Sequence, residues 1–232
     1  MKKYLILLAL FVASGVTLLA LGQPKVREYQ RWNFDKDIKG WRFDNQDQNP
    51  DNQCTIVDGV VKIWTRKGSV DRKKITTLDE NYTTGRYTWR TYISQFGVGD
   101  QSSIGSWIYS DDHHEIDYEV GYGKATVRAE LGAVPDDLVA YMTTQDFPFA
   151  SVPVLIKSGW HIFEIDLSLV DGKYFVQWII DGQVRASVQQ TYGNQIGFRI
   201  LCSVENLKFI GDQPATQDNY GLFDYVEYTY HK

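Results

Sequence analysis

Residues 115–119 read Glu115-Ile116-Asp117-Tyr118-Glu119, three acids that alternate with two apolar residues. Successive side chains of a β-strand point to opposite faces of the sheet. The three carboxyl groups are therefore expected to share one face of a strand, and Ile116 and Tyr118 the other. The apolar pair would anchor the strand in a core, and the acid row would line a surface or cleft that this anchoring holds rigid.

Three carboxyl groups in one row repel one another. Cα atoms on one face of a strand follow each other at about 6.6 Å, so Asp117 crowds both neighbours and at least one pKa is expected to rise. A protonated and an ionised carboxyl at the same pH are what glycosidic bond cleavage requires. On this interpretation Glu115 is the nucleophile, Glu119 is the general acid and then base, and Asp117 orients Glu115. The alternative for such a pattern in isolation is an amphipathic strand with a solvated acidic face.

The surrounding sequence predicts more short strands and no helix beyond the N-terminal segment. Turn signals of the Asp-Gly type stand at Asp58-Gly59 and Asp181-Gly182. Loops are expected at residues 45–53 and around Pro148 and Pro153. The strands are predicted at 60–64, 86–93, 104–109, 160–167, 174–180, 183–188, 198–204 and 223–230. Strands at such short intervals predict an all-β sandwich or barrel.

Composition fits one domain, predicted over residues 23–232. The chain has 232 residues, 43% of them hydrophobic and 14% aromatic, which is enough for one sizeable core. The net charge of −5 argues against nucleic acid or an anionic membrane as a partner, and it is compatible with a neutral polymer. We expect a monomer whose partner is a polysaccharide.

The N-terminus predicts a secretory signal over residues 1–22. Lys2-Lys3 precedes an apolar run from Tyr4 to Leu21, and small residues follow, with cleavage near Gly22. The protein is then secreted or periplasmic. A membrane anchor is the alternative, because the run is nearly long enough to span a bilayer. In a secreted protein Cys54 and Cys202 could form one disulfide, and neither lies in a metal or nucleophile motif.

Several motifs, in this order, resemble glycoside hydrolase family 16, the jelly-roll β-glucanases that include lichenases and laminarinases. Residues 115–119 match the family's E-[ILV]-D-x-E motif, and residues 85–90 resemble its G-R-[FY]-E-x-R strand with Thr88 in place of Glu. Further similar strands are residues 160–166, 178–182 and 223–226. The resemblance runs from about Trp32 to the C-terminus.

The resemblance implies a concanavalin A-like β-jelly-roll sandwich of two antiparallel sheets with an open cleft on its concave face. It also implies retaining, endo-acting hydrolysis of a β-1,3 or β-1,3-1,4-glucan-like polysaccharide by double displacement. Glu115, Asp117 and Glu119 then take the places of the nucleophile, the assisting acid and the acid/base.

The resemblance also implies which residues bind substrate and which bind a metal ion. Trp107 and Tyr109 fall where the family places aromatic residues of the cleft, and His114 falls in the subsite beside the nucleophile. Gly59, through its carbonyl, and Asp224 match a structural calcium site. No cofactor is required for the reaction.

The chain departs from the family pattern at positions that contact substrate. His113-His114 replaces the Trp-Asp of lichenases, and with Asp111 and Asp112 these histidines form either a metal site or a solvated polar turn. Ser203-Val204-Glu205 replaces an Asn-Leu-Trp. The changes suggest a different or charged polysaccharide, or a weak enzyme. A non-catalytic carbohydrate-binding module and a transglycosylase on the same scaffold stay open as alternatives.

Overall fold

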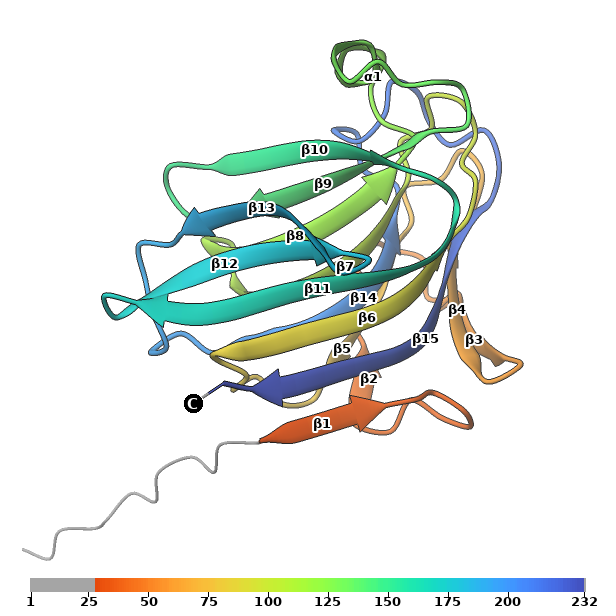
Figure 1. The fold of residues 1–232 in the computed structure, drawn as a ribbon. Helices are drawn as coiled ribbons and strands as arrows, with labels where there is room; N and C mark the ends of the chain where they lie inside the picture. The colour runs from red at the N-terminus through yellow and green to blue at the C-terminus, as the bar shows by residue number, and fades with distance from the viewer. Residues whose placement is uncertain (1–27, 232) are drawn as a thin grey trace, which may run out of the picture.

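The structure is a computed structural model that describes residues 28–231. Antiparallel strands form two layers, with one short helix, α1 (Ala125–Glu130), outside them (Figure 1). The eight-stranded sheet contains β1 (Tyr29–Trp32), β3 (Cys54–Val57), β4 (Val60–Thr65), β6 (Gly85–Ile93), β11 (Gly159–Val170), β12 (Lys173–Ile180), β13 (Gln183–Gln189) and β15 (Asn219–Tyr230). The seven-stranded sheet contains β2 (Trp41–Phe43), β5 (Arg72–Thr77), β7 (Ser103–Asp111), β8 (His114–Gly121), β9 (Leu138–Thr144), β10 (Ala150–Ile156) and β14 (Arg199–Glu205). The predicted all-β jelly-roll sandwich of two antiparallel sheets is confirmed.

Strand order places the acid strand in the interior of its sheet. The seven-stranded sheet runs β10-β9-β8-β7-β14-β5-β2, so β8 is hydrogen-bonded to β9 on one side and β7 on the other. The eight-stranded sheet runs β13-β12-β11-β6-β15-β4-β3, with β1 also paired to β15. A strand bonded on both edges is rigid, which suits a strand that carries functional side chains.

The core lies between the two sheets and follows the alternation in the sequence. On β6, Tyr87, Trp89 and Ile93 are fully buried, whereas Arg86 is exposed. On β8, Ile116 and Tyr118 are fully buried on the core side, as the sequence predicts. Burial of these apolar faces drives the two layers together.

Both predicted Asp-Gly turns are present. Asp58 and Gly59 have φ of 50° and 81° between β3 and β4, and Asp181 and Gly182 have φ of 50° and 76° between β12 and β13. Positive φ at both central residues is the geometry of the two-residue hairpin turn that Asp-Gly favours.

Two sequence expectations about secondary structure are wrong. The helix α1 forms at residues 125–130, where no helix was expected. Pro153, expected to mark a loop, lies within β10. Strand β10 is at the edge of its sheet, where a residue without a backbone N–H is tolerated because no strand lies on its far side.

Cys54 and Cys202 do not form the disulfide that a secreted protein could have made. Both are free thiols, Cys54 on β3 and Cys202 on β14, in different sheets. Burial raises the pKa of the Cys54 thiol to about 12 and that of Cys202 well above its ordinary value. These thiols therefore stay protonated and act as small apolar side chains.

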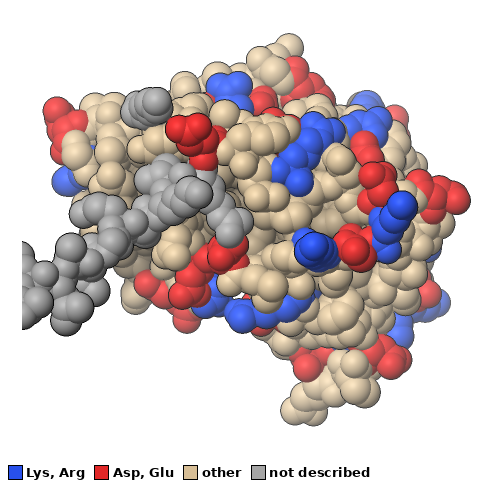
Figure 2. Space-filling view, turned by 90° about the horizontal axis from the view of Figure 1, so that it is seen from below, with Lys and Arg blue, Asp and Glu red and all other residues tan. Residues whose placement is uncertain are grey.

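The predicted signal segment at residues 1–22 lies outside the described residues, so its cleavage or anchoring stays a prediction. Across residues 28–231, no helix has the length and apolar content needed to cross a membrane. On the face seen from below, Lys and Arg side chains lie among Asp and Glu side chains and uncharged surface (Figure 2). That face therefore presents mixed charge.

Candidate active site

Strand β8 is held to the opposite sheet by side chains that cross the core. The Tyr118 hydroxyl lies 2.9 Å from the carbonyl oxygens of Glu164 and Ile179. In return, Trp178 Nε1 donates a hydrogen bond of 3.0 Å to the backbone carbonyl of Asp117. These contacts hold β8 in one orientation against the core. The side chains of Glu115, Asp117 and Glu119, on the opposite face of the strand, therefore have a fixed direction too.

A cleft of about 690 Å³ lies over the outer face of the seven-stranded sheet, and Glu115, Asp117 and Glu119 all line it. The prediction that the three acids share one face of a strand is therefore confirmed geometrically. Trp107 and Tyr109, on the neighbouring strand β7, line the same cleft. The cleft brings together five of the six residues predicted for catalysis and substrate binding.

Asp117, at the centre of the row, is 3% exposed. Burial raises its pKa well above the ordinary value, and the charges of Glu115 and Glu119 raise it further. Both effects favour the protonated form of Asp117. A protonated carboxyl is a hydrogen-bond donor, and its neighbour Glu115 is the acceptor in reach.

The two outer acids differ in how strongly their surroundings favour the protonated form. Burial raises the pKa of Glu119 well above its ordinary value, and the charges of Glu205 and Glu115 add to this. Burial also raises the pKa of Glu115, and hydrogen bonding with Asp117 opposes that rise. The charge of Lys74 lowers the pKa of both outer acids. Burial thus favours the protonated form of Glu119, whereas Glu115 has a hydrogen-bond partner that favours its ionised form, and such a difference suits an acid beside a nucleophile.

Glu119 receives a hydrogen bond from the side chain of a neighbouring strand. The Ser103 hydroxyl on β7 donates to a Glu119 carboxyl oxygen. On β7 between Ser103 and Trp107 stands Gly105, opposite Glu119 in the strand register. A Cβ at Gly105 would lie 2.4 Å from the Ser203 hydroxyl and 3.1 Å from the Trp107 ring, so glycine keeps this part of the cleft floor open.

A fourth acid, Glu205 on β14, lines the cleft and was not predicted as a site residue. It is 1% exposed and forms two ion pairs, with Arg72 Nε at 2.5 Å and with Lys74 Nζ at 2.8 Å. Lys74 Nζ also donates a hydrogen bond of 3.0 Å to Gln46 and lies 4.9 Å from the centroid of the Trp107 ring. The polar residue that replaces a family Trp is therefore part of a buried charge cluster.

Trp107 and Tyr109 occupy the cleft in different ways. Trp107 is buried, and its Nε1 donates a hydrogen bond of 3.0 Å to the Ser203 hydroxyl. The Tyr109 ring packs edge-on against Trp107, and its hydroxyl donates a hydrogen bond of 2.9 Å to Asp112. Trp107 thus contributes to the floor of the cleft, and Tyr109 to its rim.

His114 is the one predicted substrate-binding residue that does not line the cleft. Its Nδ1 lies 2.8 Å from Asp111, and its ring packs at right angles on Tyr192 with the centroids 4.4 Å apart. His113 is exposed, and its backbone N–H donates to Asp111 at 2.9 Å. These contacts describe a polar turn that stabilises the end of β8, as the second of the two sequence interpretations proposed.

Two loops contribute aromatic side chains to the cleft that could not be predicted from sequence patterns. Phe149 precedes β10 and Phe209 follows β14; each lines the cleft and each is 61% exposed. Large exposed apolar rings at the rim of a cleft are suited to stacking on the C–H face of a sugar. No local pattern marks loop residues as neighbours of a strand far away in the sequence.

The calcium site that the family resemblance implied at Gly59 and Asp224 stays a prediction. The Asp224 carboxylate accepts a hydrogen bond of 2.5 Å from Arg90 and forms an ion pair with it. Gly59 lies in the β3–β4 turn. Over residues 28–231, no group of three or more His, Cys, Asp or Glu side chains is arranged to hold a metal ion.

Comparison with known proteins is informative at the level of the fold. No protein-family model matches the sequence, and no curated protein matches it significantly. Among solved structures, the chain is similar to a Bacillus licheniformis β-glucanase, with 13% identity and a TM-score of 0.60 over 89% of this chain and 100% of the other. It is similar to a β-1,3-1,4-glucanase (lichenase) derived from a mouse hindgut metagenome, with 14% identity and a TM-score of 0.59 over 88% and 99% of the two chains.

A third similar structure is the Crh5 transglycosylase in its apo form, with 15% identity and a TM-score of 0.62 over 89% of this chain and 85% of the other. The three neighbours are two β-glucanases and a transglycosylase, and at 13%, 14% and 15% identity the similarity concerns the fold. The jelly-roll fold predicted from the resemblance to glycoside hydrolase family 16 is confirmed: the chain has the fold of these β-glucanases and of this transglycosylase.

Proposed function

We propose that this protein is a retaining, endo-acting glycoside hydrolase that cleaves a β-linked polysaccharide of the β-1,3 or β-1,3-1,4-glucan type. The observation that carries the proposal is the placement of Glu115, Asp117 and Glu119 side by side on the floor of one cleft. The fold shared with β-glucanases supports it. The predicted secretion signal would bring the enzyme to an extracellular or periplasmic polysaccharide.

In this mechanism Glu119, which keeps its proton, protonates the oxygen of the scissile glycosidic bond. Ionised Glu115 attacks the anomeric carbon from the opposite side and forms a glycosyl–enzyme ester. Asp117 donates a hydrogen bond to Glu115 and so orients the carboxylate. Glu119, now ionised, then removes a proton from water, which hydrolyses the ester and restores both carboxyl groups.

The test is a reducing-sugar screen over laminarin, mixed-linkage glucan, xyloglucan, agarose and carrageenan, followed by product analysis. Release of internal fragments, with NMR showing that the first product has the same anomeric configuration as the substrate, is the expected result. Inverted products would contradict the double displacement. Absence of cleavage across the whole panel would contradict the proposal for these glycans.

Transglycosylation is the second candidate, because a transglycosylase shares the fold. It uses the same ester and differs only in the acceptor, a sugar hydroxyl in place of water. Longer products that appear when acceptor oligosaccharides are added to the reaction would favour it. A binding module without catalysis has no need for three crowded carboxyl groups in one cleft, since their repulsion destabilises the fold.

Glu205 gives a prediction about pH. Its negative charge raises the pKa of Glu119, and Glu119 must be protonated to act as the acid. Glu205→Gln removes that charge and leaves Arg72 and Lys74 without their counter-ion, so the pKa of Glu119 should fall. The alkaline limb of the pH profile of kcat/KM should therefore move to lower pH, by on the order of one unit, which corresponds to about 1.4 kcal/mol.

The matched control is Asp112→Asn, which removes a carboxylate from the exposed rim of the same cleft. This control should leave the alkaline limb in place. Thermal melts of both variants distinguish an effect of Glu205 on the pKa of Glu119 from an effect on stability. If Glu205→Gln lowers the melting temperature and leaves the alkaline limb of the pH profile in place, Glu205 only supports the fold.

A further inference from the structure

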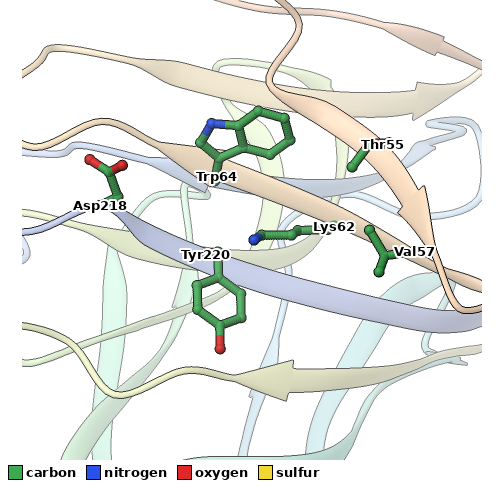
Figure 3. A pocket seen from close by; sticks show the side chains of 6 residues that line it. All are labelled: Thr55, Val57, Lys62, Trp64, Asp218 and Tyr220. Carbon is green, nitrogen blue, oxygen red and sulfur yellow. The ribbon is translucent and has the colours of Figure 1, made fainter.

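A second hollow, of about 260 Å³, lies on the eight-stranded sheet, away from the acid row. It is formed by strands β3 and β4 and by the start of β15. Figure 3 shows the rings of Trp64 and Tyr220 on either side of the Lys62 ammonium group, with Thr55 and Val57 across from them and Asp218 at one end. Strand β4 alternates, with Val61 and Ile63 buried in the core, so Lys62 and Trp64 point outward.

The hollow is one end of a row of aromatic rings that crosses four strands. Tyr220 is directly opposite Trp64, and its ring stacks with that of Tyr92 at a centroid distance of 6.4 Å and an interplanar angle of 17°. Tyr92 is directly opposite Trp160, with the ring centroids 5.5 Å apart. With about 4.8 Å between neighbouring strands, the row Trp64, Tyr220, Tyr92, Trp160 extends for about 14 Å.

These rings lie on the outer side of the sheet. Trp160 is 39% exposed, and Trp64, Tyr92 and Tyr220 are half-buried. Cross-strand aromatic pairs stabilise a sheet on their own, but they do not require a hollow beside them. The hollow adds a concave space in which apolar ring surface and charged groups converge, and such convergence characterises a ligand site.

The charges around the row balance one another. Lys62 Nζ lies 4.7 Å from the centroid of the Tyr220 ring, and it makes no hydrogen bond or ion pair within residues 28–231. Asp218 lines the same hollow with the opposite charge. Arg90, over the Trp160 ring at 4.3 Å, is neutralised by Asp224 at 2.5 Å. A polyanion such as a nucleic acid would gain little from this surface.

We propose that the row from Trp64 to Trp160, with the hollow at Lys62 and Asp218, is a second binding site for a neutral β-linked polysaccharide. A sugar ring has an apolar C–H face, which stacks on an aromatic ring. Its rim carries hydroxyl groups, which the Lys62 ammonium can donate to and the Asp218 carboxylate can accept from. The proposal rests on the proposed function only for the choice of glycan, since the site would hold the polymer that the cleft acts on.

Such a site would raise the local concentration of polymer at the enzyme without taking part in the chemistry. Its contribution is therefore expected for long chains, which can reach both faces of the molecule, and not for short oligosaccharides that fill the cleft alone. This difference separates the site from the cleft experimentally.

The test uses affinity electrophoresis in gels that contain laminarin, mixed-linkage glucan or xyloglucan, with the full chain carrying Glu115→Gln so that the glycan stays intact. Adding Trp64→Ala and Tyr220→Ala should weaken retardation by at least one of these polymers about tenfold, equal to ~1.4 kcal/mol. Tyr29→Ala, at an exposed aromatic residue on β1 outside the row, is the matched control and should leave retardation unchanged.

A second variant guards against a loss caused by misfolding. Thr55→Arg keeps every aromatic ring and fills the hollow from an exposed position on β3. It should weaken retardation like the double variant. With the catalytic residues intact, both variants should lose polymer turnover several-fold and keep their kcat/KM on a short oligosaccharide of the same linkage.

The outcomes of the two proposals are distinguishable. Retardation that depends on the row without any cleavage by the wild type would support this site and contradict the proposed hydrolase. Cleavage by the wild type with retardation unchanged in both Trp64→Ala/Tyr220→Ala and Thr55→Arg would overturn this site and leave the hydrolase standing. Absence of retardation by all three polymers would also overturn it.

Discussion

Glu115→Gln should lower kcat on any glycan that the wild type cleaves by about 10⁴-fold or more, because it removes the nucleophile of the double displacement. The amide has nearly the shape of the carboxyl, but it cannot form the ester with the anomeric carbon. The fold should persist, because the substitution removes one charge from a row of acids that repel one another. Steady-state kinetics and a thermal melt measure the two effects.

Glu119→Gln on an activated substrate is the matched comparison. A dinitrophenyl leaving group departs without a proton, so the first step should survive in Glu119→Gln and fail in Glu115→Gln. Asp112→Asn, at the rim of the cleft, should keep the wild-type rate. Wild-type hydrolysis by Glu115→Gln, or equal loss of the first step in both variants, would show that the roles are assigned wrongly.

The second large effect is expected on stability. Lys73 on β5 is 0% exposed, and its Nζ lies 2.9 Å from the Asp47 carboxylate and 2.9 Å from the carbonyl oxygen of Asn49. Asp47→Ala would leave this ammonium buried without a counter-ion. Breaking one partner of a buried ion pair costs about 3–5 kcal/mol, and urea denaturation should show a fall of that size in the free energy of unfolding.

The exposed pair Asp136–Lys157 provides the control. Asp136→Asn removes a carboxylate that lies 2.9 Å from Lys157 at the surface, where both side chains are more than half exposed. Such a change is expected to stay within about 0.5 kcal/mol. Replacing both Asp47 and Lys73 by Leu and Met should recover much of the lost stability. A loss below about 1 kcal/mol in Asp47→Ala would contradict the importance of the buried pair.

The Lys73 pair also affects the cleft. Asp47 belongs to the loop at residues 45–53, and its other carboxyl oxygen accepts the Arg72 backbone N–H at 2.5 Å. The same loop presents Gln46 to the cleft, where it accepts a hydrogen bond from Lys74. Loosening the loop in Asp47→Ala should therefore raise KM as well as lower stability.

Local sequence patterns were sufficient to predict the acid strand. The period-two alternation at residues 115–119 determines which side chains share a face, and the buried Ile116 and Tyr118 leave one orientation for the strand. The Asp-Gly turns were predictable for the same reason, since positive φ at two successive residues is a property of a short segment. Both features depend on residues adjacent in sequence.

Strand β5 shows where this reasoning stops. Its sequence begins Arg72-Lys73-Lys74, which reads as a solvated charged stretch, yet Lys73 and Lys74 are both buried. Their counter-ions come from the distant residues Asp47 and Glu205. A pairing across more than a hundred residues, as between Lys74 and Glu205, leaves no local signal. The family resemblance placed Glu205 at a position that contacts substrate, but neither strand β5 nor the buried ion pairs of Glu205 could be found from the sequence.

The hydrogen bond from Trp178 Nε1 to the Asp117 carbonyl joins the acid row to the opposite layer of the sandwich. Because β8 also contacts that layer through Tyr118, the carboxyl groups cannot separate from the core while the two layers remain packed. Heat inactivation and global unfolding should then coincide in a single cooperative transition. If the proposed function holds, the carboxyl groups stay in place up to the temperature of unfolding, whereas the loops around the cleft can change in sequence without displacing them.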